Sequence, residues 1–97
     1  NGKTYIVKKL IIYPGHRISV QKHLYRSEHW TVVKGCAKVL LGKKEKNLNE
    51  NESILIKKNT IHSIRNDSKE NIEIIETQIG EKLLEDDIIR INDIYDR

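Results

Sequence analysis

Isoleucine dominates this sequence, and its excess constrains the fold more than any other feature. The 97-residue chain has 16 isoleucines and 5 valines, but only 1 alanine and no phenylalanine. β-Branched side chains are stiff at χ1 and pack well on pleated sheets, whereas alanine is the strongest helix former. Length limits the chain to one domain, since domains typically hold about 100–150 residues. The composition therefore predicts one domain, residues 1–97, built mainly from strands.

Turn residues divide the chain into short segments of strand character. Lys43, Lys44 and Lys46 are expected at a solvated hairpin tip. The apolar residues after Glu81 fit either a short helix or a strand from Asp87, and we favour a turn followed by a short strand. No 3.6-residue pattern precedes this tail, which indicates an all-β sandwich or barrel. Strands are expected over Thr4–Tyr13, Ile18–His23, His29–Lys34, Ala37–Leu41, Ser53–Ile56, Ile61–Asn66 and Asn71–Ile79.

Charge is unevenly distributed but does not indicate a nucleic-acid partner. Residues 1–46 carry a net charge of +9, residues 47–75 carry −1 and residues 76–97 carry −4. The lysines are scattered among strands and turns, no recognition helix is evident and aromatic side chains are few. No apolar run approaches the ~18 residues of a membrane span, so no membrane partner is expected. The single cysteine, Cys36, rules out an internal disulfide and predicts a cytoplasmic location.

Four side chains form the pattern that carries chemistry. The first segment contains Gln21-x-His23-x4-Glu28, and a later segment begins at His62. Residues i and i+2 of a strand share a face, so Gln21 and His23 point the same way, and a tight turn can bring Glu28 beside them. Two imidazoles, a carboxylate and a carboxamide make a mixed nitrogen and oxygen set. Such a set suits Zn, Mn, Fe or Co.

Strand alternation also predicts which neighbours face away from this set. Ile18 and Val20 are expected on the strand face opposite to Gln21. His29 follows Glu28 directly and is expected on the opposite face of its own strand.

The spacing resembles the two metal motifs of the cupin superfamily. Gln21 stands where the first motif normally has a histidine. Asn59 stands where the second motif normally has glycine, and asparagine tolerates a positive φ better than most residues. Lys57 replaces the usual proline of that loop. The resemblance implies an all-β, cupin-type double-stranded β-helix, also called a jelly-roll barrel.

Further segments resemble a narrower family. They read PGHRISVQ (14–21), RSEHW (26–30), ETQIG (76–80) and EDDIIR (85–90). They are similar to segments of type II mannose-6-phosphate isomerases. In many bacteria these form the C-terminal domain of a bifunctional mannose-1-phosphate guanylyltransferase/mannose-6-phosphate isomerase. A glutamine in place of the first motif histidine is a feature of that family.

The resemblance implies a metal-dependent isomerase that interconverts mannose 6-phosphate and fructose 6-phosphate through an enediolate. Zinc is the expected divalent metal, held by the four residues named above. Arg90 is expected to hold the phosphate or the enediolate oxygen, with a surface ion pair to Asp86 or Asp87 as the alternative. Glu76 is expected to be catalytic and Gln78 to bind substrate; the alternative is that they bind a loop backbone. Tyr25 is expected to contact substrate, although Leu24 and Tyr25 replace histidines of the family.

Two other functions and the wider assembly follow from the same resemblance. The domain is alternatively a non-catalytic sugar-binding or dimerising module of a guanylyltransferase, or a metal-dependent cupin oxygenase. The family's upstream R-P-W-G strand is absent, so we expect the chain to be a C-terminal fragment of a longer protein. The strand edge left open, together with the resemblance, predicts a homodimer. The expected small-molecule partner is a sugar phosphate.

Overall fold

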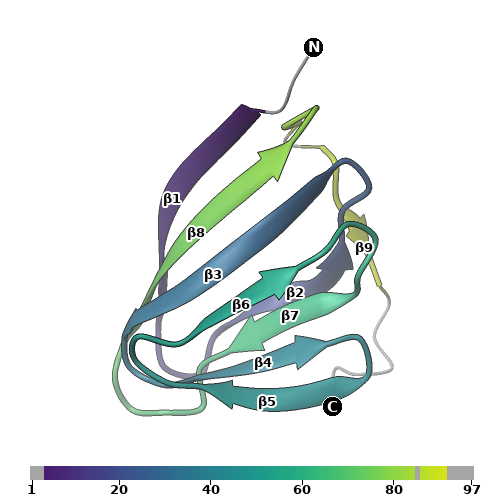
Figure 1. Cartoon of the computed structure of the whole chain (residues 1–97). Coiled ribbons are helices and arrows are strands. Elements are labelled where there is room, and N and C mark those ends of the chain that lie inside the picture. The colour runs from purple at the N-terminus through teal and green to yellow at the C-terminus, as the bar shows by residue number, and fades with distance from the viewer. Residues whose placement is uncertain (1–3, 85, 92–97) are drawn as a thin grey trace.

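The structure is a computed structural model that describes residues 4–84 and 86–91. These residues form nine strands and no helix (Figure 1). Consequently, no helix in the described part of the chain is long and apolar enough to cross a membrane. The strands are β1 (Thr4–Ile12), β2 (Arg17–Lys22), β3 (Arg26–Lys34), β4 (Ala37–Leu41), β5 (Lys44–Leu48), β6 (Ser53–Ile56), β7 (His62–Arg65), β8 (Ile72–Gly80) and β9 (Ile89–Arg90).

The strands form two antiparallel sheets, which confirms the all-β prediction. One sheet has the order β1-β8-β3-β6 and the other the order β5-β4-β7-β2-β9. Strands that are neighbours in a sheet are mostly distant in sequence, so each sheet is assembled by crossing between the two layers. The end of β2, the start of β3 and β9 lie together at one end of the molecule (Figure 1). This end carries the polar interior described below.

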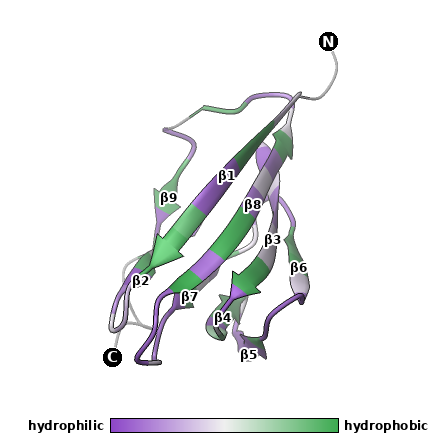
Figure 2. Ribbon diagram, turned by 90° about the vertical axis from the view of Figure 1, so that its left-hand side faces the viewer, coloured by the Kyte–Doolittle hydropathy of each residue, from purple (hydrophilic) through white to green (hydrophobic). Residues whose placement is uncertain are grey.

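Isoleucine side chains fill the space between the sheets. Figure 2 shows hydrophobic and hydrophilic residues interspersed along β1 and β8. In β8, Ile72 and Ile74 are fully buried, and Glu76 and Gln78 continue along the same buried face. The inner face therefore changes from apolar to polar towards the end of the strand. The core cluster consists of Ile12, Trp30, Val32, Ala37, Val39, Leu48, Ile54, Ile56, Ile64, Ile72 and Ile74.

Most expected strands are found, but one was missed. Ala37–Leu41 and Ser53–Ile56 have the expected bounds, and the other expected strands are shifted by up to three residues. The expected hairpin tip is wrong for Lys44 and Lys46, because both lie in β5. Leu48 is the only buried residue of β5, so this edge strand has no alternation of apolar and polar residues to reveal it.

A β-bulge corrects the expected facing of β2. Ile18 lies opposite Ile64, and Gln21 lies opposite His62, so three steps in β2 match two steps in β7. Ile18 therefore shares the inner face with Gln21 and packs against the core. The prediction that Ile18 faces away from Gln21 is wrong, since a bulge shifts the alternation by one residue.

β1 is one of the two edge strands of its sheet, and its outer face carries apolar side chains together with Lys9. The side chains of Tyr5 and Val7 are 70% and 57% exposed. The expected homodimer stays a prediction, and this edge is the surface on which it would form.

Gly80 allows β8 to run close beside the start of β3. A Cβ at this position would overlap the carbonyl oxygen of Tyr25 and lie 3.0 Å from Cα of Arg26. We therefore expect Gly80→Ala to lower the free energy of unfolding by about 1–3 kcal/mol or more, as for overpacking. Urea denaturation of the purified protein measures this change.

Gly15→Ala is the matched control. Gly15 has φ +80°, but no atom would lie within 4 Å of its Cβ, so only backbone strain of about 1 kcal/mol is expected. Equal destabilisation by the two substitutions would contradict the close approach at Gly80.

Candidate metal centre

Three strands bring two histidines and a carboxylate together inside the barrel. His23 directly follows β2, Glu28 lies in β3 and His62 begins β7. Each residue offers one ligand atom, and these three atoms all lie within 4.8 Å of one another. The side chains are 3%, 3% and 1% exposed, respectively. The spacing in the sequence is thus matched by convergence in space.

Backbone contacts between loops hold the two histidines near each other. The N–H of Asn59 donates to the carbonyl oxygen of His23 at 2.6 Å. Asn59 has φ +62°, a conformation that asparagine adopts more readily than most residues, as the sequence predicts. The loop before β7 is thereby fixed to the end of β2, and the two imidazole rings lie 4.9 Å apart between centroids.

Hydrogen bonds fix which nitrogen of each ring faces the cluster. Nδ1 of His23 contacts the carbonyl oxygen of Asp87 at 2.5 Å, and Nδ1 of His62 contacts that of Thr60 at 2.8 Å. A carbonyl oxygen only accepts, so both Nδ1 atoms carry the proton and donate. Each Nε2 then faces Glu28, at 3.1 Å for His23 and 3.8 Å for His62. Metal-binding histidines are commonly oriented in this way.

An unpartnered nitrogen shows that this arrangement fits a cation. Nε2 of His62 is buried and has no hydrogen-bond partner among the described residues. A buried polar atom without a partner costs about 1–3 kcal/mol, and such atoms are rare in folded proteins. Two Nε2 lone pairs and a carboxylate facing one point match the ligands of a divalent transition metal. His23, Glu28 and His62 can therefore hold a metal ion.

Burial and charge shift the pKa values of the three groups. Burial raises the pKa of Glu28, but the hydrogen bond and charge of His23, with His62 and Arg26, outweigh it and lower that pKa overall. Burial lowers the pKa of His23, but the hydrogen bonds to Glu28 and the Asp87 carbonyl outweigh it, so that pKa is raised above 6.5. Burial lowers the pKa of His62. The cluster thus pairs an ionised carboxylate with one protonatable histidine.

Two buried charged residues that the sequence analysis did not single out support this cluster. Arg26 donates from Nε to Oε2 of Glu28 at 2.9 Å, and its Nη2 lies 3.4 Å from Nε2 of His23. The carboxylate of Asp87 accepts from the N–H groups of Leu24 and Tyr25 at 2.8 and 2.9 Å. Asp87 therefore fixes the β2–β3 turn while its carbonyl orients His23. Arg26, two residues before Glu28, could have been found from strand alternation.

Glu76 and Gln78 face the interior beside the cluster. Trp30 Nε1 donates to Oε1 of Glu76 at 3.1 Å, and Gln78 Nε2 donates to Oε2 at 2.6 Å. The Trp30 ring also packs edge-on against the His62 ring, with 5.6 Å between centroids. Both partners of Glu76 are side chains, so the alternative of binding a loop backbone is not realised in the described residues.

The other residues expected at the site are Gln21, Arg90 and Tyr25, and they differ in burial. Gln21 is buried and lies directly opposite His62 on one side and Arg90 on the other. Arg90 therefore projects from the same sheet face as Gln21, but it is exposed. It makes no ion pair with another described residue, so the expected alternative pair with Asp86 or Asp87 is not formed. Tyr25 is 44% exposed, and its ring lies 4.9 Å from Nζ of Lys82.

Structural comparisons establish the type of fold. The chain superposes on an uncharacterized conserved protein with a double-stranded β-helix domain from Klebsiella pneumoniae with a TM-score of 0.72 and 21% identity, covering 80% of this chain and 76% of that one. It also superposes on a sugar phosphate isomerase from a cupin superfamily of Silicibacter pomeroyi with a TM-score of 0.73 and 12% identity, covering 80% and 51%. The expected cupin-type double-stranded β-helix is thus confirmed.

Sequence comparisons define the family. The mannose-1-phosphate guanylyltransferase of Escherichia coli (strain K12) is 44% identical over 96 residues, which are 99% of this chain and 20% of that protein. The chain spans about a fifth of the length of the curated relatives it matches. A family model described as "Mannose-6-phosphate isomerase C-terminal" matches residues 1–93. The chain therefore belongs to the mannose-6-phosphate isomerase C-terminal family, as its sequence motifs indicate.

Proposed function

We propose that this domain is a metal-dependent aldose–ketose isomerase that interconverts mannose 6-phosphate and fructose 6-phosphate. The observation that carries this proposal is the buried group of His23, Glu28 and His62, in which Nε2 of His62 has no partner among the described residues. Membership of a mannose-6-phosphate isomerase family supports the choice of substrate. We further propose zinc as the metal, a cytoplasmic location consistent with the free Cys36, and a place in a longer guanylyltransferase chain.

The metal would be held by His23, Glu28 and His62, with Gln21 beside them. When bound, a divalent ion supplies Lewis-acid polarisation of the substrate oxygens. Arg26 and Asp87 have positioning roles in this proposal. Arg26 orients the carboxylate of Glu28, and the Asp87 carbonyl fixes the proton of His23 on Nδ1. Both contacts leave Nε2 of His23 facing the metal position.

A cavity of about 340 Å³ beside the cluster has the size and charge for a sugar phosphate. Lys8 and Arg26 supply positive charge to it, and Gln78 supplies an amide that can bind a hydroxyl group. Its remaining lining is apolar: Ile6, Leu83, Leu84 and Ile88. Apolar walls strengthen each polar contact with a substrate because they exclude water.

Glu76 is the proposed base that moves the proton between C1 and C2. Its carboxylate is held by Trp30 and Gln78 on the inner face of β8, so its position is fixed before substrate binds. A carboxylate in this position is a suitable general base, because proton transfer needs a group held within hydrogen-bond reach of the substrate carbon. Tyr25 remains a proposed substrate contact.

The decisive test combines metal content with isomerase activity. In His62→Ala a ligand is lost, so we expect zinc affinity to fall at least about 100-fold, more than for an outer partner of a metal ligand. Isomerase activity should fall with it. Elemental analysis and a coupled assay with mannose 6-phosphate, made on the same samples, measure both quantities.

His29→Ala is the matched control, because His29 is exposed on the opposite face of β3 from Glu28. A change of about twofold or less is expected there, as for ordinary surface substitutions. Equal metal loss in the two variants would refute the proposed centre. A metal-free, inactive wild-type protein that still binds the sugar would instead support the non-catalytic module.

Zinc affinity should rise with pH, because the metal must displace a proton from His23. The raised pKa of His23 means that its protonation stabilises the metal-free protein below pH 6.5, and that this stabilisation is lost as pH rises through the folded-state value. The pKa values of Glu28 and His62 are both lowered, so above pH 6.5 His23 is the group of the cluster whose proton the metal displaces.

Titration with zinc against a chromophoric chelator, from about pH 5.5 to pH 8, measures this dependence. One displaced proton gives an affinity about tenfold lower per pH unit below the pKa of His23. A zinc affinity that does not change with pH would contradict the proposal that His23 loses a proton when it binds the metal.

Arg90 should serve the reaction through its two-pronged guanidinium group. If it holds the phosphate equally in the ground and transition states, Arg90→Lys raises KM and leaves kcat nearly unchanged. If it stabilises the enediolate, kcat falls by about 100-fold, as for a lost charge-assisted donor. Steady-state kinetics with mannose 6-phosphate distinguish the two. Unchanged kinetics in both Arg90→Lys and Arg90→Ala would remove Arg90 from the site.

A further inference from the structure

The cavity beside the metal centre is lined by one cation that no described residue holds. Two cations, Lys8 and Arg26, line this cavity. Arg26 is held twice, because it donates to the Glu28 carboxylate at 2.9 Å and to the carbonyl oxygen of Leu84 at 3.2 Å. Lys8 makes no hydrogen bond or ion pair with another described residue. The ammonium group of Lys8 is therefore the charge that is available to a ligand in this cavity.

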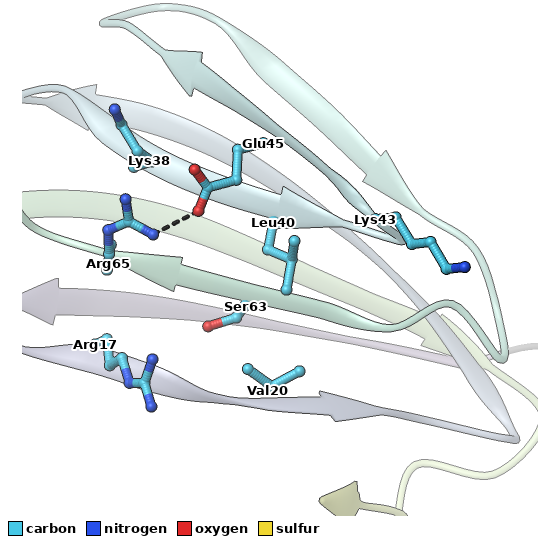
Figure 3. Close-up of a pocket in the computed structure, with 8 residues that line it drawn as sticks. All are labelled: Arg17, Val20, Lys38, Leu40, Lys43, Glu45, Ser63 and Arg65. Atoms are coloured by element: carbon cyan, nitrogen blue, oxygen red, sulfur yellow. Dashed lines mark hydrogen bonds and ion pairs between the residues drawn. The ribbon is translucent and has the colours of Figure 1, made fainter. Parts of the chain in front are cut away.

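Two other cations of the sheets show how this chain usually neutralises such a charge. Lys9, the next residue, pairs with Glu73 at 3.3 Å on the opposite face of β1. Arg65, on the outer face of the five-stranded sheet, donates to the carboxylate of Glu45 (Figure 3). Each of these cations meets a carboxylate of the chain itself. Lys8 lines a cavity instead, which points to an anion from outside the chain.

The carboxylate nearest to Lys8 in the sheet register is already engaged. Lys8 lies directly opposite Glu76. One oxygen of Glu76 accepts from Trp30 at 3.1 Å and the other accepts from Gln78 at 2.6 Å. These two donors hold the carboxylate in the interior, and Lys8 forms no ion pair with it. The base proposed above and the free ammonium group are thus neighbours that do not neutralise each other by contact.

The register also separates Lys8 from the metal ligands by a fixed span. Glu28 lies opposite Gln78, and Gln78 lies opposite Ile6, which shares the inner face of β1 with Lys8. Neighbouring strands are 4.7–4.9 Å apart, so the strands that carry Glu28 and Lys8 are about 10 Å apart. A small molecule that reaches both the metal centre and Lys8 therefore needs its two binding groups at opposite ends.

We propose that Lys8 binds the phosphate of the substrate and selects sugars whose phosphate is remote from the reacting carbons. This inference rests on the proposed isomerase function. In a hexose 6-phosphate, C1 and C2 are at one end of the carbon chain and the phosphate is at the other. With C1 and C2 beside Glu76, the phosphate extends towards β1, where the ammonium group of Lys8 binds it as a point charge. Arg90, the other cation expected to hold phosphate, does not line this cavity.

Calorimetric titration of the whole protein with mannose 6-phosphate, in the presence of zinc, tests the phosphate contact. Lys8→Gln should raise Kd about tenfold or more, as expected for the loss of a hydrogen bond between charged groups. Lys9→Gln is the matched control, because it removes the same charge from the next residue, which faces the other side of β1. Its Kd should change by about twofold or less. Equal effects of the two substitutions would overturn the proposal.

Mannose 1-phosphate, titrated in parallel, tests the selection by phosphate position. It carries the same charge at the other end of the sugar, so the wild-type protein should bind it about tenfold or more weakly than mannose 6-phosphate. Lys8→Gln should remove most of this difference. A variant that keeps the wild-type ratio of the two Kd values would show that Lys8 does not select the phosphate position.

The isomerase assay separates this inference from the proposed function. In Lys8→Gln, KM should rise and kcat should stay nearly unchanged, because the phosphate contact is the same in the ground and transition states. A lower kcat with an unchanged Kd would contradict the phosphate contact. If the wild-type protein binds mannose 6-phosphate without isomerising it, the proposed function fails, while the two Kd comparisons still decide the role of Lys8. A wild-type protein that does not bind mannose 6-phosphate would overturn both.

Discussion

The bulge in β2 is the constraint on which both faces of the five-stranded sheet depend. Ile18 packs into the apolar core, while Gln21 and His23 face the polar interior a few residues later. A regular strand would place Ile18 and Gln21 on opposite faces, because side chains alternate with a period of two. The extra residue between them allows both to point inward. It also turns Val20 outward, where it lines a cavity on the opposite face of the sheet.

The polar interior is stable because every charge in it has an opposite charge or a donor close by. A buried carboxylate without partners would be neutralised by a large upward shift of its pKa. Glu28 instead has a lowered pKa, since Arg26 and both histidines surround it. The remaining defect is Nε2 of His62, which a cation would satisfy. Among the described residues, the cluster therefore has opposite charges in contact but keeps one buried nitrogen without a hydrogen-bond partner.

The sequence predicted strand bounds best where neighbouring turn residues set them. Ala37–Leu41 and Ser53–Ile56 were bounded correctly, since turn residues flank short apolar segments there. It was least informative at β5, where a polar edge strand pairs with β4 without burying more than Leu48. The bulge in β2 leaves no local signal either, because it is set by the register with β7, more than forty residues away.

The same distinction explains which parts of the site could be anticipated. The spacing and family resemblance pointed to His23, Glu28 and His62, which the fold brings within 4.8 Å. The supporting role of Asp87 depends on contacts with His23, Leu24 and Tyr25, separated by 62–64 residues in sequence. No local pattern encodes such contacts, so only the folded chain reveals them.

The two faces of the five-stranded sheet differ in charge, and this difference accounts for part of the uneven charge of the sequence. The N-terminal half has a strong excess of basic residues, and Arg17, Lys38 and Lys43 of that half gather on the outer face with Arg65. The inner face of the same sheet carries Gln21 and His62. Since neighbouring residues of a strand project to opposite faces, a single strand such as β7 contributes His62 to the metal cluster and Ser63 and Arg65 to the outer face. A change of register in β7 would therefore disturb both faces of the sheet together, because it moves every side chain of the strand to the other face.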